Sequence, residues 1–350
     1  MSTQNGSVTM QDVAALAKVS VKTVSNVLSG YEHVSAKMRA RVMAAVTELN
    51  YEINVSARNL RTGRTQVLGL AVPELSQAYF AELADAVIRA AKERNYTVLI
   101  EQTTTGGPDE ISTVSAMRRH AIDGVIFSPF APESGDLSRL DLEFPVVVLG
   151  DRDAVSPADH ITMSNVAAVK AATDHLIESG RSRIAVIGSD PHDPVGTAAL
   201  RFRGYAESLR EHGRDVASDL VCSVQLWHRA DGAAAVERLL ERGVEFDGLV
   251  CFNDALALGA MARLQQLGRR VPEDVAVVGF DDIEDSRFST PSLTTVSPGR
   301  EEIARLAVDT LVRRIEHPGQ RDVPVDLAVG YELVVRGSSA PLAAAAASSS

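Results

Sequence analysis

The chain has 350 residues, 45% of them hydrophobic and 23% charged, a composition typical of a soluble globular protein with two or three domains. No apolar run approaches the roughly 18 residues of a membrane-spanning helix and no secretory leader opens the chain, so we expect a cytoplasmic protein that is neither exported nor membrane-bound. The net charge of −11 is uneven: residues 1–65 carry +4 and the remainder −15, which predicts that only the N-terminal part meets phosphates.

The first predicted elements are two short helices joined by a tight turn, over residues 8–29. Thr9 stands at an N-cap position with Asp12 three residues later, the pattern of a capping box. An apolar face follows on the first helix at Val13, Leu16 and Ala17. Such a pair is a helix-turn-helix if its second helix displays groups that read DNA, and an ordinary helical hairpin if it does not.

The second helix, with Ser20 as its expected N-cap, carries short or polar side chains opposite its apolar face. These are Val21, Lys22, Ser25 and Asn26. If the helix enters the major groove, Lys22 can donate to guanine, Asn26 can pair with adenine and Val21 can meet a thymine methyl group. Hydroxyl groups that can bond phosphates would fix the register, namely those of Thr9, Ser20, Thr23 and Ser25.

A third helix is predicted over residues 36–49, with Ser35 as its cap, and a polar stretch follows at 54–65. In the order and spacing of its residues, this N-terminal part resembles the DNA-binding headpiece and hinge of the lactose-repressor family. The matching motifs are T-x-x-D-V-A-x-x-A-x-V-S-x-x-T-V-S from Thr9, H-V-S at 33–35, L-N-Y at 49–51 and A-R-x-L-R-T-G-R-T at 57–65. The resemblance extends to about Gly337.

The resemblance implies a transcriptional regulator that binds double-stranded operator DNA as a homodimer. A two-fold dimer predicts an inverted-repeat operator with half-sites one to two helical turns apart. Ser35, Tyr51 and Asn54 join the candidate DNA contacts on the same ground. Lys18 stands in the turn where the family usually has Gly, at a position that would need a positive φ.

The hinge at residues 54–65 has its own expected role. Residues 55–62 are too few to be helical alone in water, and they should fold when two copies pair over DNA. The resemblance implies that Leu60 enters a central minor-groove step as an apolar wedge, with Arg61 beside it. The alternative is a plain linker leucine that packs on the body.

From residue 66 onward, short β-branched strands alternate with amphipathic helices, which predicts an α/β body with parallel sheets covered on both faces. The expected strands are 67–72, 97–100, 124–127, 146–149, 184–187, 249–252 and 275–278. The pattern runs twice, so we predict two doubly wound sheets with a ligand in the cleft between them.

The resemblance implies a periplasmic-binding-protein-like body in which the chain crosses between two subdomains. The expected domains are a headpiece (1–53), a hinge (54–65), and a body (66–337) of subdomains at about 66–165 with 298–325 and about 166–297 with 326–337. Residues 338–350 have low complexity and are predicted to be a disordered tail. The tail has no apolar heptads, which favours a dimer over a coiled-coil tetramer.

Polar side chains follow three predicted strands: Asp151, the pair Asn253-Asp254, and the pair Asp281-Asp282. Each alone is more often a helix cap or an ion-pair partner, and we expect Asp254 to be a cap. Trp227, the only tryptophan, can stack on a sugar ring. By resemblance, Arg201, Asn253 and Asp281 are polar contacts of a small-molecule effector. The further candidates for the effector site are Tyr79, Phe80, Asp151 and Trp227.

By pocket chemistry and resemblance, a sugar is favoured as the effector over a purine or a protein co-regulator, and the expected function is repression of sugar-utilisation genes. A sugar-binding protein of a transporter shares the two-sheet body, but it would need an export signal and would lack the first sixty residues. The sequence has no nucleotide-binding or hydrolase motif, so we expect no enzyme activity and no cofactor. Cys222 and Cys251 are expected to be buried reduced thiols rather than metal ligands.

Overall fold

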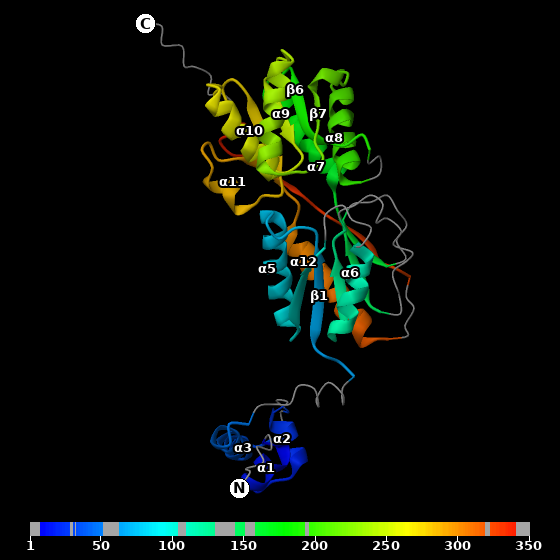
Figure 1. The fold of residues 1–350 in the computed structure, drawn as a ribbon, viewed down its shortest axis with the longest axis vertical. Coiled ribbons are helices and arrows are strands. Elements are labelled where there is room, and N and C mark those ends of the chain that lie inside the picture. Colours follow the sequence, from blue (N-terminus) through cyan, green and yellow to red (C-terminus); the bar gives the residue numbers. More distant parts are fainter. Residues whose placement is uncertain are drawn as a thin grey trace, which may run out of the picture. The chain divides into compact units, whose positions relative to one another are not determined.

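The computed structural model describes residues 8–28, 31, 33–51, 63–103, 110–129, 144–150, 158–192, 196–318 and 323–340 (Figure 1). The chain forms two compact units, Met1–Thr65 and Gln66–Ser350, which we call the N-terminal unit and the body. Among the described residues, no helix has the length and apolarity needed to cross a bilayer. Residues 54–62 of the predicted hinge lie outside the described part, as do residues 52 and 53.

The N-terminal unit has three described helices, α1 (Met10–Leu16), α2 (Val21–Leu28) and α3 (Ala36–Glu48). They enclose a small core of side chains that are at most 8% exposed: Val13, Ala14, Ala17, Val24, Val27, Val42, Ala45 and Tyr51. Leu16, which we predicted on the buried face, is 41% exposed. The prediction was wrong because the inward residues are Val13, Ala14 and Ala17, and Leu16 lies about 100° around the helix from the centre of that face.

The helices of this unit begin at the predicted caps. The Thr9 hydroxyl accepts the Asp12 N–H at 3.4 Å, and the Thr9 N–H donates to the Asp12 carboxylate at 2.8 Å, which completes the capping box. Ser20 and Ser35 cap the next two helices by accepting the N–H three residues on, at 3.1 Å and 3.3 Å. Lys18 in the turn has a φ of +48°, a conformation that Gly adopts freely and a Lys does not.

The body contains two six-stranded sheets. The first sheet is parallel throughout and has the order β11-β5-β4-β3-β1-β2. Its strands are β1 (Val67–Val72), β2 (Thr97–Gln102), β3 (Gly124–Phe127), β4 (Val146–Leu149), β5 (Asp159–Met163) and β11 (Asp326–Val329). The second sheet has the order β12-β10-β9-β8-β6-β7, in which only β12 runs antiparallel. Its strands are β6 (Ile184–Ser189), β7 (Val221–Ser223), β8 (Gly248–Cys251), β9 (Ala276–Phe280), β10 (Thr294–Ser297) and β12 (Glu332–Val334).

Helices cover both faces of each sheet, as predicted for strands with continuous apolar runs. On the first sheet, α5 (Ala78–Glu93) and α12 (Arg300–Glu316) share one core, and α6 (Glu110–Met117) packs on the other. On the second sheet the pairs are α7 (Asn165–Glu178) with α8 (Thr197–Glu211), and α9 (Arg229–Glu241) with α10 (Asp254–Gln266). A short helix, α11 (Glu284–Phe288), follows β9.

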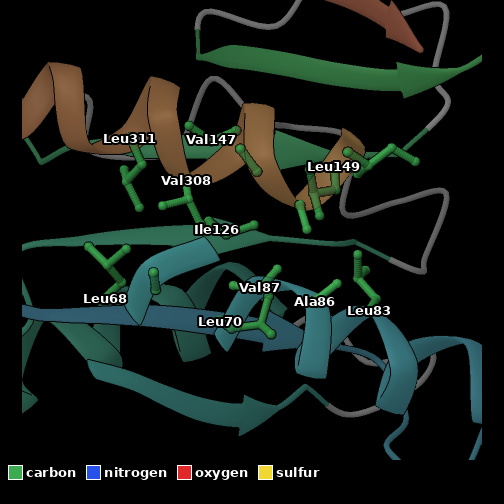
Figure 2. Close-up of a cluster of buried hydrophobic side chains, with 14 of the residues drawn as sticks. Leu68, Leu70, Leu83, Ala86, Val87, Ile126, Val147, Leu149, Val308 and Leu311 are labelled. Carbon is green, nitrogen blue, oxygen red and sulfur yellow. The ribbon is translucent and has the colours of Figure 1, made fainter. Parts of the chain in front are cut away.

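Figure 2 shows how the first sheet's core brings distant segments together. Leu70 of β1 and Ile126 of β3 meet Val87 of α5, while Val308 and Leu311 come from α12, which begins at Arg300 and so lies far later in the chain. All five side chains are fully buried. The chain therefore returns to the first sheet after completing most of the second, and with the later step to β12 it crosses between the two halves of the body three times.

The last crossing comes later than we expected. β11 still belongs to the first sheet, where it pairs with β5 from Asp326 to Val329, and only β12 joins the second. The predicted tail also begins too early, because Ser338 and Ser339 are buried. The Ser338 carbonyl accepts the Val277 N–H at 2.9 Å, and its hydroxyl donates to the Val277 carbonyl at 2.6 Å. Residues 341–350 lie outside the described part.

Candidate functional site

The N-terminal unit presents the predicted reading face on α2. Val24 and Val27 turn into the core, Val21 is 41% exposed and Lys22 is exposed. Ser25 and Asn26 are half-buried on the same helix. A short helix that keeps its apolar side inward and these groups outward has the form that a major-groove helix requires.

The predicted phosphate contacts cluster at helix starts. Thr9, Ser20 and Ser35 are exposed, and the Ser20 hydroxyl lies 2.9 Å from that of the half-buried Thr23. Helix N-termini also carry unsatisfied N–H groups, which favour phosphate oxygens. Tyr51 was predicted to contact DNA, but it is only 8% exposed and belongs to the core of this unit. Asn54, Leu60 and Arg61 lie outside the described residues.

The body contains a pocket of about 240 Å³. From the first half it is lined by the segment that starts α5, and from the second half by the starts of α9 and α10 and the turn after β9. The lining residues are Ser76, Gln77, Ala78, Tyr79, His228, Arg229, Ala230, Asn253, Ala255, Asp281 and Ile283. Three predicted effector contacts, Tyr79, Asn253 and Asp281, therefore meet at one pocket. Asp151 lies outside the described residues.

The remaining predicted contacts support the pocket from behind. Phe80 is half-buried against the first sheet's core, with its ring 5.3 Å from that of Tyr79. Trp227 is half-buried, and its ring centroid lies 6.0 Å from that of Phe252. Neither side chain lines the pocket. Of the three aromatic residues predicted to contact the effector, only Tyr79 lines it.

Arg201 is 3% exposed and is held by the protein itself. Its Nε donates to the Asn165 side chain at 2.8 Å, and its Nη1 donates to the Phe252 carbonyl. The guanidinium carbon lies 3.6 Å from the Phe280 ring centroid and 5.3 Å from that of Trp227. These contacts fix a positive charge behind the pocket rather than among its lining residues.

Asp281 is the most distinctive residue of the pocket. It is 6% exposed, and it has a φ of +116°, which non-glycine residues rarely adopt. Burial raises the pKa of its carboxyl well above the usual range, against the opposing charges of Arg201 and Arg300. No residue in the described part of the chain donates a hydrogen bond to this carboxylate, so it can accept hydroxyl groups of a ligand.

Asn253 has a structural role at the same pocket. Its side-chain oxygen caps α10 by accepting the Leu256 N–H at 2.8 Å, and its amide donates to the Trp227 carbonyl at 3.0 Å. We expected Asp254 to be the cap, and that prediction was wrong. Asp254 is the first residue of α10, is fully buried and points its carboxylate inward.

His228 and Glu74 belong to the site but were not predicted from the sequence. The His228 Nε2 lies 2.8 Å from the Glu74 carboxylate, so this pair joins the α9 start to the loop that precedes α5. Hydrogen bonds from Ser76 and His228 lower the pKa of the Glu74 carboxyl although its burial works in the opposite direction. A lone His in a polar stretch does not by itself indicate a binding site. The position of His228 after β7, at the carboxyl edge of the sheet, is the feature that could have indicated it.

The chemistry of the pocket is that of binding. It offers carboxylate and amide groups beside the Tyr79 ring, which suit hydroxyl groups and apolar C–H surface. In the described ranges, no group of three or more His, Cys, Asp or Glu side chains could hold a metal ion. Cys222 and Cys251 are free and buried, as predicted.

Comparisons with known proteins agree with this geometry. Residues 9–54 match the model of the bacterial regulatory proteins of the lacI family, and residues 173–339 match a periplasmic binding protein-like domain. The ribose operon repressor of Haemophilus influenzae is 31% identical over 315 residues, which are 89% of this chain and 93% of that protein.

Two solved structures resemble the whole chain. The complex of the transcriptional regulator CelR with cellobiose is 31% identical, with a TM-score of 0.70, over 95% of this chain and 99% of that one. The Lac repressor dimer bound to operator and the anti-inducer ONPF is 26% identical, with a TM-score of 0.81, over the same shares. The chain therefore belongs to the lacI family of bacterial regulatory proteins, and it is a DNA-binding transcriptional regulator, not an enzyme.

Proposed function

We propose that this regulator represses sugar-utilisation genes and that a small sugar in the pocket controls its operator binding. The observation that carries the proposal is the buried Asp281 carboxylate, which lines the pocket and accepts no hydrogen bond from any described residue. Such an acceptor suits the hydroxyl groups of a sugar. A relative named as a ribose operon repressor and a regulator solved with cellobiose support this ligand class.

The pocket volume favours a compact ligand. At about 240 Å³ it lies below the roughly 300–1,000 Å³ of sites for drug-sized ligands. A monosaccharide therefore fits the proposal better than a larger sugar. Tyr79, Asn253 and Asp281 are the proposed contacts, with Arg201 and Trp227 behind them and Asp151 as a further candidate.

On the DNA side, two copies of the chain would bind an inverted-repeat operator in the cytoplasm as a homodimer. Val21, Lys22 and Asn26 would read bases, and the hydroxyls of Thr9, Ser20, Thr23, Ser25 and Ser35 would fix the register on phosphates. Leu60 and Arg61 would occupy the minor groove between the half-sites. The solved Lac repressor, a dimer bound to operator, supports operator binding as a homodimer.

A thermal-shift panel on the full chain tests the ligand class. The panel contains D-ribose, other pentoses and hexoses, cellobiose, and the nucleobases adenine, guanine and hypoxanthine. A sugar that binds only the folded state should raise Tm, since a ligand at a hundred times its Kd adds about 2.7 kcal/mol of stability. Asp281→Asn tests whether the sugar binds at this pocket, and the rise in Tm caused by the sugar should be smaller in this variant. A shift with nucleobases alone would replace the sugar by a purine, and no shift with any compound would refute the proposal.

A further inference from the structure

The turn after β9 has an unusual backbone. Asp281 has a φ of +116° and Asp282 a φ of +49°, so two consecutive residues with side chains adopt conformations that favour glycine. Such conformations persist only where surrounding contacts hold them, and they are common at ligand sites. This turn supplies Asp281 and Ile283 to the pocket.

A single buried carboxylate, that of Asp254, lies beneath this turn. Its Oδ2 accepts the Ile283 N–H at 3.1 Å and the Ser286 hydroxyl at 2.7 Å, and its Oδ1 accepts the Thr295 hydroxyl at 2.5 Å. Asp254 is 0% exposed. Two of its three donors come from the turn and from α11, which follows the turn directly, and the third comes from β10.

Two further features show that the site is built for this carboxylate. A Cβ atom at Gly279 would lie 2.2 Å from the Asp254 Oδ1, so only glycine leaves room for the oxygen beside β9. The Thr295 hydroxyl also lies 3.4 Å from the Asp282 N–H, which connects the carboxylate to the second strained residue. In the described chain, no Lys or Arg forms an ion pair with Asp254.

A buried carboxylate without a cation is expensive to keep, so stability alone does not explain it. Asp254 follows Asn253 at the start of α10, and Asn253 also lines the pocket. The carboxylate thus connects two parts of the pocket lining, the α10 start and the Asp281 turn, through hydrogen bonds to one group.

We propose that Asp254 is a positioning residue, which holds the Asp281–Ile283 turn in its strained conformation and so aims Asp281 at the ligand. The effect of Asp254 on ligand affinity rests on the function proposed above, whereas the effect of Asp254 on the turn does not. Two arginines complete the arrangement: Arg336 donates to the Asp282 carboxylate at 2.6 Å, and Arg300 donates to the Asp281 carbonyl at 3.0 Å. Neither of these contacts fixes the Ile283 N–H.

The test compares Asp254→Ala with Asp254→Asn in the full chain. Ala removes all three acceptor contacts. Asn is nearly isosteric: its oxygen can accept from Ile283 and Ser286, and its amide can donate to the Thr295 hydroxyl, which is free to turn. Asp159→Ala is the matched control, because Asp159 is a 4% exposed carboxylate of the other sheet that pairs with Arg314 at 2.7 Å.

The first readout is hydrogen exchange of peptides that span residues 279–288, measured without ligand. Asp254→Ala should speed exchange there by roughly tenfold or more, because the Ile283 N–H loses its acceptor, and Asp254→Asn should restore slow exchange. Asp159→Ala should leave this segment unchanged. Equal exchange in Asp254→Ala and wild type, or equal acceleration by Asp159→Ala, would overturn the proposal. If Asp254→Ala does not fold, Ser286→Ala offers a milder test, because it removes only one of the three donors. This variant should give a smaller acceleration of exchange, confined to residues 279–288. Unchanged exchange in Ser286→Ala would then overturn the proposal.

The second readout is the Kd of D-ribose, measured by calorimetry on the same variants. Asp254→Ala should weaken it roughly tenfold or more, whereas Asp254→Asn and Asp159→Ala should stay within about threefold of wild type. If Asp254→Asn raised the Kd of D-ribose as much as Asp254→Ala does, positioning by hydrogen bonds would be contradicted. If neither D-ribose nor any other compound of the panel binds the wild type, the proposed function fails, and hydrogen exchange still decides the role of Asp254.

Discussion

The Arg300 guanidinium lies 2.6 Å from the Glu82 carboxylate, and each of these two residues also contacts the second half of the body. Arg300 begins α12 and Glu82 belongs to α5, and both helices pack on the first sheet. Arg300 also donates to the Asp281 carbonyl in the second half, and Glu82 accepts the Glu284 N–H at 2.9 Å. Contacts of this kind can differ between two closure angles, and only a ligand with different affinities for the two can change their balance.

We expect Arg300→Ala to weaken the coupling between pocket and operator. The change in operator affinity on adding sugar should shrink by roughly 0.5–2 kcal/mol, while sugar-free operator binding persists. Glu82→Gln, which keeps an oxygen for the Glu284 N–H, should have a similar effect. The double variant should lose no more than Arg300→Ala alone, because Glu82→Gln acts through an ion pair that Arg300→Ala already removes. Fully additive losses in the double-mutant cycle would disprove the link.

Base reading by α2 predicts a loss of discrimination rather than of general affinity. Lys22→Ala and Asn26→Ala should each cost roughly 1–3 kcal/mol of preference for operator over random DNA. Thr9→Ala, at a phosphate position, should instead weaken binding to both DNAs about equally. Fluorescence anisotropy at a fixed salt concentration measures all three. If Lys22→Ala and Asn26→Ala lost equal affinity for both DNAs, these side chains would contact the DNA backbone and not the bases.

For the hinge we predict that Leu60→Ala reduces both operator affinity and operator bending. The reason is that an apolar wedge stabilises a kinked step that the shortened side chain cannot fill. Energy transfer between dyes at the two operator ends reports the bend directly. Unchanged bending with a bound variant would leave Leu60 as an ordinary linker residue.

The Asp254 carboxyl predicts a pH-dependent stability difference. Burial raises its pKa to about 7 from 3.8, so its favourable contribution is complete below pH 3.8 and is lost as the pH rises through about 7. Between pH 5 and 7, wild type should lose at most about 1.4 kcal/mol per pH unit relative to Asp254→Asn, which cannot titrate. Urea unfolding of both proteins across this range measures the difference. A constant difference would mean that Asp254 keeps one protonation state.

Much of the fold follows from local patterns. The caps at Thr9, Ser20 and Ser35 could be identified because an N-cap needs one residue type at one position. The predicted strands 67–72, 124–127 and 146–149 match β1, β3 and β4 because short, nearly continuous apolar runs are typical of strands that are buried on both faces. The strand β10 was missed, since Thr294 and Thr295 resemble a surface segment although both are fully buried.

The site was predicted less completely, for a physical reason. Strand ends indicated Asn253 and Asp281, because parallel strands gather their carboxyl ends at one edge. Nothing local shows that Asp254 turns inward while Asn253 caps the helix, because its donors, Ile283, Ser286 and Thr295, are about 30 to 40 residues away. The same holds for Glu74, whose partner His228 lies 154 residues later.

We propose that a sugar acts on operator binding through the pocket carboxylate of Asp281. The most direct measurement is operator binding by wild type and Asp281→Ala as the concentration of the sugar found in the panel increases. We predict that the variant binds the operator as wild type does without sugar, and that its affinity no longer changes when sugar is added. A normal sugar response in Asp281→Ala would contradict the claim.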